Sequence, residues 1–492
     1  MPRIPLLSGT GLVVASAPDD AVVVGPPPPH AHVADIAAAV RDALRFPLEG
    51  RPLEALAREA RRATIVVEPP VLPIPSVPTD PRQTAIAAVV AELERLGVQT
   101  GWQTILVAGG FGRRLSQREL PALVTPELAR RFHGRVVVHD VEDPELAELD
   151  GFRVSPALLD TDLVLVVTSA ETVLHGGPAA LVGAAGRDEL RAASADSLLE
   201  TRGSGGWQTA VALERALGRR VPVVGVSVVL NHPVVSGLLR GYPYEPEARE
   251  RVARTPLRLA FNSLPGIARR EVLRRLPTEV SVAAAFAGPP SVVHAEALLR
   301  AVELRRAELP QPVDALVVGI PGTAPLVPRE RPNPLLAAYL GLGLALRLWR
   351  ERFPVVDGGS AILVSRFVRH FPHPTQRPYR AFFQGSWSPR DPEMLAAAEQ
   401  SVGGDERAIE AYRRGETVHP LLPFRDWDAC RPAQDRLGAV LVAGARDASA
   451  ARQLGFVPAH GVGAALDLAR GQGAERIGFL LCPPYFPLRV GR

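Results

Sequence analysis

The strongest constraint on the fold is a repeated alternation of short apolar runs with helical patterns. The helical patterns lie at 34–45, 84–97, 293–309, 333–352 and 447–453. Runs rich in Val, Ile, Leu and Ala predict strands at 63–68, 104–109, 135–141, 161–169, 222–231, 314–320, 360–365, 439–444 and 476–482. Strands that are apolar throughout are buried on both faces, which is typical of a parallel sheet covered by helices. The sequence therefore predicts an α/β fold with doubly wound, Rossmann-like layers.

The length and the pattern together predict more than one domain. A chain of 492 residues suggests two to four domains, at roughly 150 residues each. The alternation of strands and helices restarts after the segment FAGPPSVVH (286–294). We expect an N-terminal catalytic or cofactor domain over 1–287 and a C-terminal α/β domain over 288–475. Residues 476–492 would form a C-terminal strand that could return to the first domain.

The chain contains no lysine, because all 56 of its Lys and Arg residues are arginine. This absence excludes every mechanism that needs a lysine Schiff base, a phosphate-binding lysine or a cofactor joined to a lysine amide. The arginines alternate with acids on helix faces, and the formal net charge is only +4. That pattern indicates solvated helix faces and argues against a nucleic-acid partner.

Cysteine content and hydropathy indicate a cytoplasmic protein. Cys430 and Cys482 lie far apart, so a disulfide framework is not expected. The longest uninterrupted apolar runs are shorter than the ~18 residues that a membrane span requires. Ser8, Gly9 and Gly11 interrupt the apolar start of the chain, so we interpret it as a β-hairpin rather than a signal peptide.

One candidate site follows the predicted strand 161–169. The segment ETVLHGGP (171–178) places His175 and Glu171 at a strand end, where open α/β sheets bind ligands. His175 would act as an acid/base and Glu171 as the carboxylate that orients it. In the alternative interpretation the segment is a helix start, and Gly176 and Gly177 serve only to allow close packing.

A glycine turn after strand 104–109 is a second candidate. In GGFGRR (109–114), Gly110 and Gly112 could bring backbone N–H groups close to an anion. Arg113 could contact a phosphate or carboxylate directly. The spacing is not that of a dinucleotide-binding fingerprint, so we predict none.

The third candidate is the segment SRFVRHFPHPTQRPY (365–379) in the second half of the chain. Its arginines could clamp a carboxylate or phosphate, and a histidine could exchange a proton with a ligand. The residues predicted to contribute are His373, as a catalytic group, with Arg369, Arg377 and Tyr379 in binding. Alternatively it is a surface loop stiffened by proline, with histidines that satisfy backbone groups.

Several segments, in order along nearly the full chain, resemble the nickel-dependent lactate racemase family. The N-terminal half carries IAAAVRDALRFPLEGRPLEALA (36–57), ATIVVEPPVLPIPSVPTDP (63–81), TILVAGGFGRRLSQREL (104–120) and TDLVLVVTSAETVLHGGPAALVGAAG (161–186). Further matches are VSVVLN (226–231), FAGPPSVVHAEAL (286–298), DGGSAILVS (357–365) and SAARQLGFVPAHGVGAALDLA (449–469). The resemblance implies two α/β domains with an active-site cleft between them.

The resemblance also implies an activity and a cofactor. Members of the family racemise 2-hydroxy acids by hydride abstraction and return. Their cofactor is a nickel-bearing pincer nucleotide, held by a lysine and ligated at nickel by a histidine. Two further histidines act as acid and base, and an arginine helps to hold the substrate carboxylate.

This chain departs from that pattern at several positions. Gly112 stands where the family has its first catalytic histidine, and Leu72 stands where it has the carboxylate-binding arginine, although Pro73 is kept. His175 is the candidate for the second catalytic histidine. The cofactor lysine is absent, and no histidine lies between His175 and His232 to ligate nickel at the family's spacing.

Two hypotheses follow. In the first, the chain is a divergent lactate-racemase-like isomerase that acts on a 2-hydroxy acid or similar small carboxylate. It would hold the nickel-pincer nucleotide noncovalently or have no cofactor. In the second, it is a catalytically inactive relative that binds a small acid or nucleotide as a sensor or partner subunit. The sequence leaves the metal and the oligomeric state open.

Overall fold

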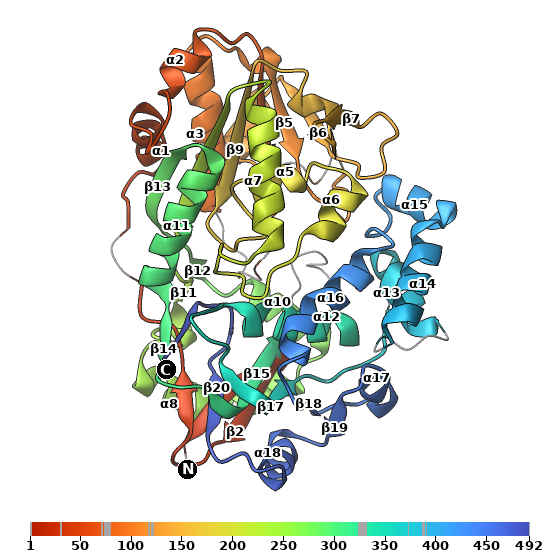
Figure 1. The fold of residues 1–492 in the computed structure, drawn as a ribbon. Helices are drawn as coiled ribbons and strands as arrows, with labels where there is room; N and C mark the ends of the chain where they lie inside the picture. The colour runs from red at the N-terminus through yellow and green to blue at the C-terminus, as the bar shows by residue number, and fades with distance from the viewer. Residues whose placement is uncertain are drawn as a thin grey trace.

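The structure is a computed structural model in which two lobes lie one above the other (Figure 1). It describes residues 2–29, 32–69, 72, 80–116, 119, 123–322, 332–371, 373–385, 389 and 391–491. Each lobe is built around a mostly parallel sheet covered by helices, so the predicted α/β class with two such layers is confirmed. No helix in these ranges is long and apolar enough to cross a membrane.

The upper lobe contains a six-stranded sheet in the order β13-β10-β9-β4-β5-β6. Its parallel strands are β4 (Ala63–Val67), β5 (Gln103–Val107), β6 (Arg135–Val138), β9 (Leu163–Ser169) and β10 (Val223–Leu230). Strand β13 (Val282–Gly288) closes one edge antiparallel to β10. Alternate residues of β4 pack on opposite faces, since Ile65 joins one apolar cluster and Val66 the other.

Helices cover both faces of this sheet, as the continuous apolar strands predict. On one face lie α1 (Ile36–Arg45) and α3 (Pro81–Arg95), and on the other lie α5 (Ala179–Val182) and α7 (Gly205–Gly218). Asp80 and Ser204 start α3 and α7 by accepting hydrogen bonds from Arg82 N and Trp207 N. Such caps satisfy N–H groups that have no partner inside the helix.

The lower lobe contains an eight-stranded sheet. Its main path is β19-β18-β17-β15-β1-β2, and β20 pairs with both β15 and β3. The strands are β1 (Arg3–Gly9), β2 (Gly11–Ser16), β3 (Val22–Val24), β15 (Val313–Pro321), β17 (Val355–Val364), β18 (Ala439–Ala443), β19 (Val457–Ala459) and β20 (Ile477–Leu480). The antiparallel pairing of β1 with β2 confirms the hairpin expected at the start of the chain.

The two sheets do not follow the predicted domain boundaries, which lay after residue 287 and after residue 475. Residues 3–24 lie in the lower sheet, while α11 (Pro290–Arg305), which follows the predicted boundary, packs on β10 and β13 of the upper sheet. The last strand of the lower sheet, β20, lies beside β15 rather than in the upper sheet. Pairing between strands hundreds of residues apart leaves no local pattern in the sequence, so the restart of alternation near 290 could not reveal it.

The segment predicted as one helix over 333–352 is irregular. It begins as α12 (Pro334–Ala338), continues as a π-helical turn over Tyr339–Leu344 and a 3-10 turn over Ala345–Arg347, and ends in β16 (Trp349–Arg350). Gly341 and Gly343 lie in the π-helical turn, where a Cβ atom would collide with Leu363 or Tyr339. The backbone packs closely against these neighbours, and the segment is not the regular helix that hydropathy alone predicts.

A group of helices on the lower lobe reaches up to the upper lobe (Figure 1). They are α13 (Arg377–Gln384), α14 (Pro392–Gly403), α15 (Glu406–Arg413) and α16 (Leu422–Gln434). Arg187 of the upper lobe donates to the carbonyl of Gly403 at the end of α14, at 2.9 Å. Tyr412 of α15 donates to the carbonyl of Gly110 at 3.3 Å, so these helices link the two lobes.

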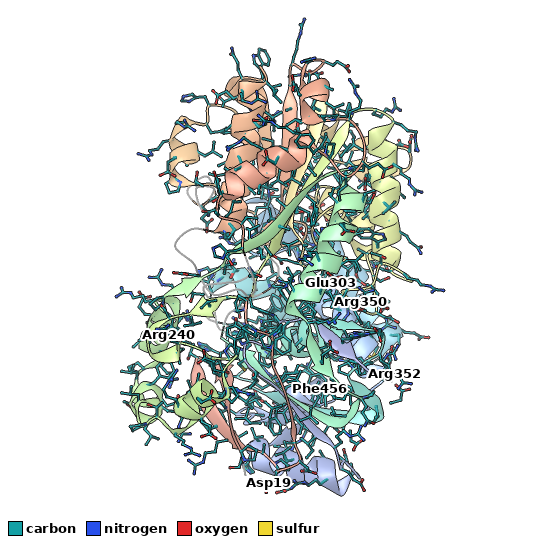
Figure 2. All side chains as sticks on the ribbon, turned by 90° about the vertical axis from the view of Figure 1, so that its left-hand side faces the viewer. Asp19, Arg240, Glu303, Arg350, Arg352 and Phe456 are labelled. Atoms are coloured by element: carbon teal, nitrogen blue, oxygen red, sulfur yellow. The ribbon has the colours of Figure 1, made fainter. Side chains whose placement is uncertain are left out.

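The remaining elements are short or peripheral. The helices are α2 (Leu53–Ala57), α4 (Pro126–Arg131), α6 (Arg187–Ala192), α8 (Pro246–Arg254), α9 (Leu257–Ser263), α10 (Gly266–Arg274), α17 (Ala448–Gln453) and α18 (Val462–Gly471). The strands are β7 (Ala147–Leu149), β8 (Phe152–Val154), β11 (Val234–Val235), β12 (Thr278–Glu279), β14 (Ala307–Leu309) and β21 (Leu488–Val490). Figure 2 shows arginines such as Arg240 and Arg352 on the outside of the lower lobe, while Phe456 lies inside it.

Candidate functional site

A cavity of about 640 Å³ lies between the lobes. The upper lobe contributes Glu68 after β4, the turn 109–112 after β5, His175 after β9, and residues of α5, α6 and 193–198. The lower lobe contributes Tyr339, Gly343, Leu344, Arg347 and one side of α16. The carboxyl ends of three neighbouring parallel strands thus open onto the cavity, which is where α/β sheets place their ligands.

His175 lies on the cavity wall with its orientation fixed by Glu68. The Nδ1 atom is 3.0 Å from Glu68 Oε1, and Glu68 Oε2 accepts a 2.7 Å hydrogen bond from Gly176 N. A carboxylate oxygen can only accept a hydrogen bond. The Nδ1 atom of His175 therefore carries the proton, and its Nε2 atom keeps a lone pair. The ring makes no other hydrogen bond within the described ranges, and the side chain is 17% exposed, which leaves Nε2 available to a ligand.

The expected pairing of His175 with Glu171 is wrong, because Glu68 is the carboxylate at Nδ1. Glu171 instead forms an ion pair with Arg82 of α3, with 2.8 Å between Oε1 and Nη1. It also accepts hydrogen bonds from Ser169 Oγ at 2.9 Å and Leu72 N at 3.0 Å. Glu171 therefore ties the end of β9 to α3, and it does not line the main cavity.

Two of the four glycines predicted to bind a ligand line the cavity, but the N–H groups of all four already have hydrogen-bond partners. Gly110 and Gly112 line the cavity. Their N–H groups donate to Gly183 O at 3.2 Å and Gly109 O at 2.9 Å. Gly176 N donates to Glu68, and Gly177 N donates to Thr168 Oγ1 at 2.8 Å. These four amides form no anion cradle.

Arg113 does not contribute a cation to the cavity. Its guanidinium holds Glu119 with two hydrogen bonds, one of them 3.0 Å from Nη1 to Oε2, and also donates to Gly415 O at 3.4 Å. These hydrogen bonds, against the cost of partial burial, lower the pKa of Glu119 to about 2. Arg113 therefore braces the turn after β5 against the lower lobe.

The described residues of the segment 365–379 do not line the cavity, although Tyr379 contacts α16. The exposed His373 caps a short turn through Thr375, with Nδ1 3.0 Å from Oγ1. Arg369 donates to Ser449 Oγ at 3.1 Å, and Arg377 is exposed at the start of α13. These three residues match the surface-loop alternative. Tyr379 differs, because it is buried and its hydroxyl donates to Asp426 Oδ2 of α16 at 2.6 Å.

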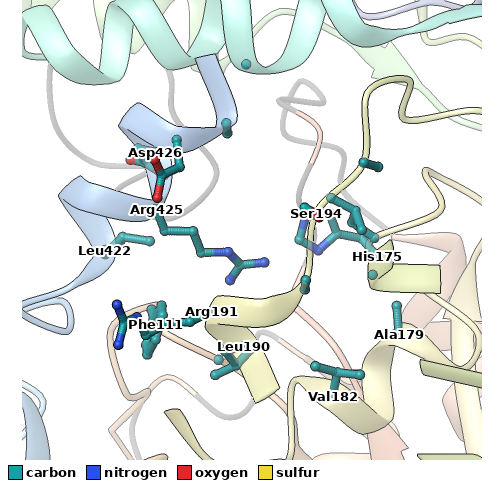
Figure 3. A pocket seen from close by; sticks show the side chains of 18 of the residues that line it. Phe111, His175, Ala179, Val182, Leu190, Arg191, Ser194, Leu422, Arg425 and Asp426 are labelled. Atoms are coloured by element: carbon teal, nitrogen blue, oxygen red, sulfur yellow. The ribbon is translucent and has the colours of Figure 1, made fainter. Parts of the chain in front are cut away.

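Sequence analysis missed the lower wall of the cavity, which is α16. Arg425 extends from this helix across the cavity toward His175 (Figure 3). It forms no ion pair with any described residue, and its guanidinium carbon lies 6.0 Å from the ring centroid of Phe111. The other cavity arginines in the described ranges are engaged: Arg191 pairs with Glu399 at 2.9 Å, Arg431 pairs with Asp428 at 3.6 Å, and Arg347 donates to the carbonyls of four residues.

Asp426 stands next to Arg425 and also lines the cavity. Its side chain is almost fully buried, and this desolvation raises the pKa of its carboxyl to about 7. The only sequence signal for this wall is the cluster of charges in LLPFRDWDACRPAQD (421–435), where apolar residues recur at helical spacing. Pro423 and Pro432 obscure that pattern, although Pro423 lies in the first turn, where it is tolerated.

The cavity does not fit a lysine-tethered nickel cofactor. The chain has no lysine, and His175 is the one imidazole that the described residues place on the cavity wall. No three His, Cys, Asp or Glu side chains in the described ranges are placed to share a metal ion. The nearby Cys430 thiol is buried, which raises its pKa far above the usual value and opposes the thiolate that nickel prefers.

Comparisons with known proteins agree with this architecture. Residues 9–153 match the family model described as the lactate racemase N-terminal domain. The lactate racemase apoprotein from Thermoanaerobacterium thermosaccharolyticum has a similar structure, with a TM-score of 0.62 and 15% sequence identity over 99% of this chain and 100% of that one. A Thermotoga maritima protein aligns with a TM-score of 0.48 and 10% identity over 93% and 99% of the two chains. No curated protein matches the sequence.

Proposed function

We propose that this chain, whose resemblance to lactate racemase is confirmed in sequence over residues 9–153 and in fold over its length, is an isomerase of that type. Its substrate would be a 2-hydroxy acid or similar small carboxylate, bound in the cavity between the lobes. The proposal assigns no role to a lysine-tethered cofactor, because the cavity does not fit one.

The pairing of His175 with Glu68 is the observation that carries the proposal. An imidazole fixed by a carboxylate through Nδ1, with Nε2 directed to a ligand, is the arrangement of a general base. Glu68 also stabilises the imidazolium that forms when Nε2 takes up a proton. In the opposite direction the same atom returns that proton.

The proposed reaction also requires a group that binds the substrate carboxylate, and Arg425 is that group. A guanidinium binds a carboxylate through two parallel hydrogen bonds. Among the described residues, Arg425 is the cavity arginine that has neither an ion pair nor a side-chain hydrogen bond, so a ligand carboxylate would satisfy it. Apolar side chains of Phe111, Leu190 and Leu422 line the cavity around it and would exclude water from the bound acid.

Replacement of His175 tests the assignment. His175→Ala should lower kcat/KM for isomerisation by about 10²-fold or more, since general acid–base catalysis contributes 10²–10⁴-fold. Chiral chromatography of small 2-hydroxy acids incubated with the protein measures the rate. His373→Ala is the matched control, because that imidazole lies outside the cavity, and it should be as active as the unaltered protein.

The alternative of an inactive binding protein predicts a different result. A small acid at a hundredfold excess over its Kd would then stabilise the folded protein by about 2.7 kcal/mol. The melting temperature would rise, and the acid would not be turned over. Full activity of His175→Ala would reject the assignment of the base. Native mass spectrometry of protein from its own host would show whether a nucleotide or nickel is bound noncovalently.

A further inference from the structure

We infer that Asp426 is a second acid/base in this cavity, so that the enzyme inverts its substrate by proton transfer between two faces and needs no cofactor. The inference rests on the proposed function and deepens it, because it specifies the reaction and narrows the substrate class. It proceeds from the placement of Asp426 relative to His175 and Arg425.

The two groups lie on opposite sides of the cavity. His175 belongs to the upper lobe and Asp426 to α16 of the lower lobe, and Arg425 extends between them (Figure 3). A carboxylate bound to Arg425 would therefore have one group on either side of its C2 atom. Inversion by proton transfer requires this placement, since the proton leaves one face and a different proton arrives at the other.

One oxygen of Asp426 is available to the ligand. Oδ2 accepts the 2.6 Å hydrogen bond from the buried Tyr379 hydroxyl, which holds the carboxyl in place. Within the described ranges the carboxyl makes no other hydrogen bond, although Asp426 contributes to the cavity wall. Oδ1 is thus the atom that meets the substrate, while Tyr379 acts as a positioning residue.

The surroundings also keep Asp426 able to exchange a proton near neutral pH. Burial disfavours its ionised form, while the Tyr379 hydroxyl and the neighbouring Arg425 favour it. The balance leaves its pKa at about 7, where a carboxyl group both gives and takes a proton readily. Most aspartates titrate near pH 4 and could not act as a proton donor at neutral pH.

The step balances without an oxidant or reductant. His175 Nε2 takes the C2 proton, and the electron pair of that C–H bond moves into the carboxylate to give a planar enediolate. Arg425 neutralises the added negative charge on the carboxylate oxygens. Asp426 Oδ1–H then donates its proton to the opposite face of C2. The reverse reaction exchanges the two roles, and both groups reset by exchange with solvent.

This chemistry narrows the substrate class. A C2 hydrogen beside a carboxylate alone is a very weak acid, and in this proposal Arg425 is the cation that stabilises the charge formed when it is removed. An aryl group bonded to C2, or a carbonyl group at C3, would delocalise the enediolate charge further. The cavity of about 640 Å³ with its apolar lining has room for an aryl substituent, so we expect aryl-substituted 2-hydroxy acids to be better substrates than lactate.

Isomerisation in deuterium oxide tests the inference, with (R)- and (S)-mandelate and both lactate enantiomers as probes. Proton NMR and chiral chromatography follow loss of the C2 hydrogen and change of configuration. We expect each product enantiomer to carry deuterium at C2. Asp426→Asn should lose racemisation by 10²-fold or more and still exchange the C2 hydrogen of one enantiomer with retention of configuration, through His175.

Two further variants support the assignment to Asp426. The exposed Asp467→Asn is the matched control and should behave as the unaltered protein. Tyr379→Phe removes the hydrogen bond that favours the ionised carboxyl, so the limb of the pH–rate profile due to Asp426 should move to higher pH. This variant also tests the inference if Asp426→Asn does not fold.

Each outcome separates the inference from the function on which it rests. Racemisation with the original C2 hydrogen retained would mean hydride transfer, and would overturn the inference while the proposed function stands. Normal racemisation by Asp426→Asn would also overturn it. If the protein is folded and none of the four acids changes configuration or exchanges its C2 hydrogen, the result counts against the proposed function for these substrates. The basis for the inference is then lost as well.

Discussion

Two buried carboxyl groups, Asp426 and Glu214, retain their protons to unusually high pH. Glu214 on α7 accepts hydrogen bonds from Ser291 N at 2.9 Å and Ser291 Oγ at 3.1 Å at the start of α11. Burial nevertheless raises its pKa to about 7. These bonds join two helices, and the unfavourable ionisation of Glu214 makes that junction sensitive to pH.

Glu214 predicts how stability depends on pH. An unfolded glutamate releases its proton near pH 4, whereas the folded one holds it to about pH 7, so the folded state binds more protons over that interval. The free energy of unfolding should therefore fall as pH rises from about 4 to about 7. Glu214→Gln should reduce this fall, by roughly 1–3 kcal/mol in urea titrations at pH 4.5 and 7.5.

The exposed Glu303→Gln on α11 is the control for that experiment. It should leave the pH dependence as it is in the unaltered protein. An identical pH dependence in Glu214→Gln and the unaltered protein would show that Glu214 titrates in the folded state as it does in the unfolded chain.

The sequence predicted some of the residues that line the cavity, but it did not reveal their partners. His175, Gly110 and Gly112 could be found because each follows a strongly apolar run, and strand ends gather at one edge of a parallel sheet. The partner of His175 could not be found in the same way. Glu68 is more than a hundred residues from His175 in the sequence, whereas Glu171 is four residues away. Glu68 nevertheless contacts the imidazole, because β4 and β9 are adjacent in the sheet.

At the scale of elements, the turn between β9 and α5 is shaped by His294 of α11. His294 is fully buried, and its Nε2 lies 2.9 Å from Thr172 O. Its ring packs so closely on the turn that a Cβ atom at Gly177 would lie 2.3 Å from His294 Cβ. The backbone of Gly177 also has a positive φ of 52°. The turn that carries His175 therefore depends on the absence of side chains here.

This packing predicts a large effect of one methyl group. Gly177→Ala should destabilise the protein by about 2–4 kcal/mol, because it adds overpacking to the strain of a positive φ. Gly203→Ala is the matched control, since Gly203 has a φ of 77° and no atom within 4 Å of its Cβ position. Urea titration should show a loss of only about 1 kcal/mol for Gly203→Ala. Equal losses would mean that His294 moves aside without cost.

The elements themselves differed in how well the sequence predicted them. Strand β9 lies within the predicted 161–169 and β4 within 63–68, because runs of β-branched residues buried on both faces are distinctive. The lower wall of the cavity was harder to predict. Residues 333–352 are buried throughout most of their length, so hydropathy carries no helical period there, and the prolines of α16 conceal its helix.

At the scale of the molecule, the lobes meet in a polar cluster beside the cavity. His419 of the lower lobe is fully buried, stacked on Phe111 at 4.5 Å between ring centroids, and its Nε2 lies 2.9 Å from Glu142 Oε1 of the upper lobe. Its Nδ1 accepts from Leu421 N, so the ring is neutral and Nε2 donates. Burial lowers the pKa of His419 and preserves this arrangement in mild acid.

Loss of this contact should loosen the lobes. His419→Ala would leave the Glu142 carboxylate without one donor and open space beside Phe111. We expect faster amide hydrogen exchange in 109–114 and 415–421, and a fall in kcat/KM for the proposed isomerisation, because both lobes line the cavity. Arg414→Ala, an exposed neighbour, is the control. Unchanged exchange in both segments would show that the other contacts between the lobes suffice.

The pairing of β3 with β20 has a consequence for the order in which the protein folds during synthesis. Strand β3 is made before the whole upper sheet, whereas its partner β20 is made more than 450 residues later. The upper sheet, from β4 to β13, is complete long before then. A nascent chain must therefore carry β1 and β3 unpaired with β15 and β20 while the upper lobe folds, and the lower sheet is complete only after β20 has been made.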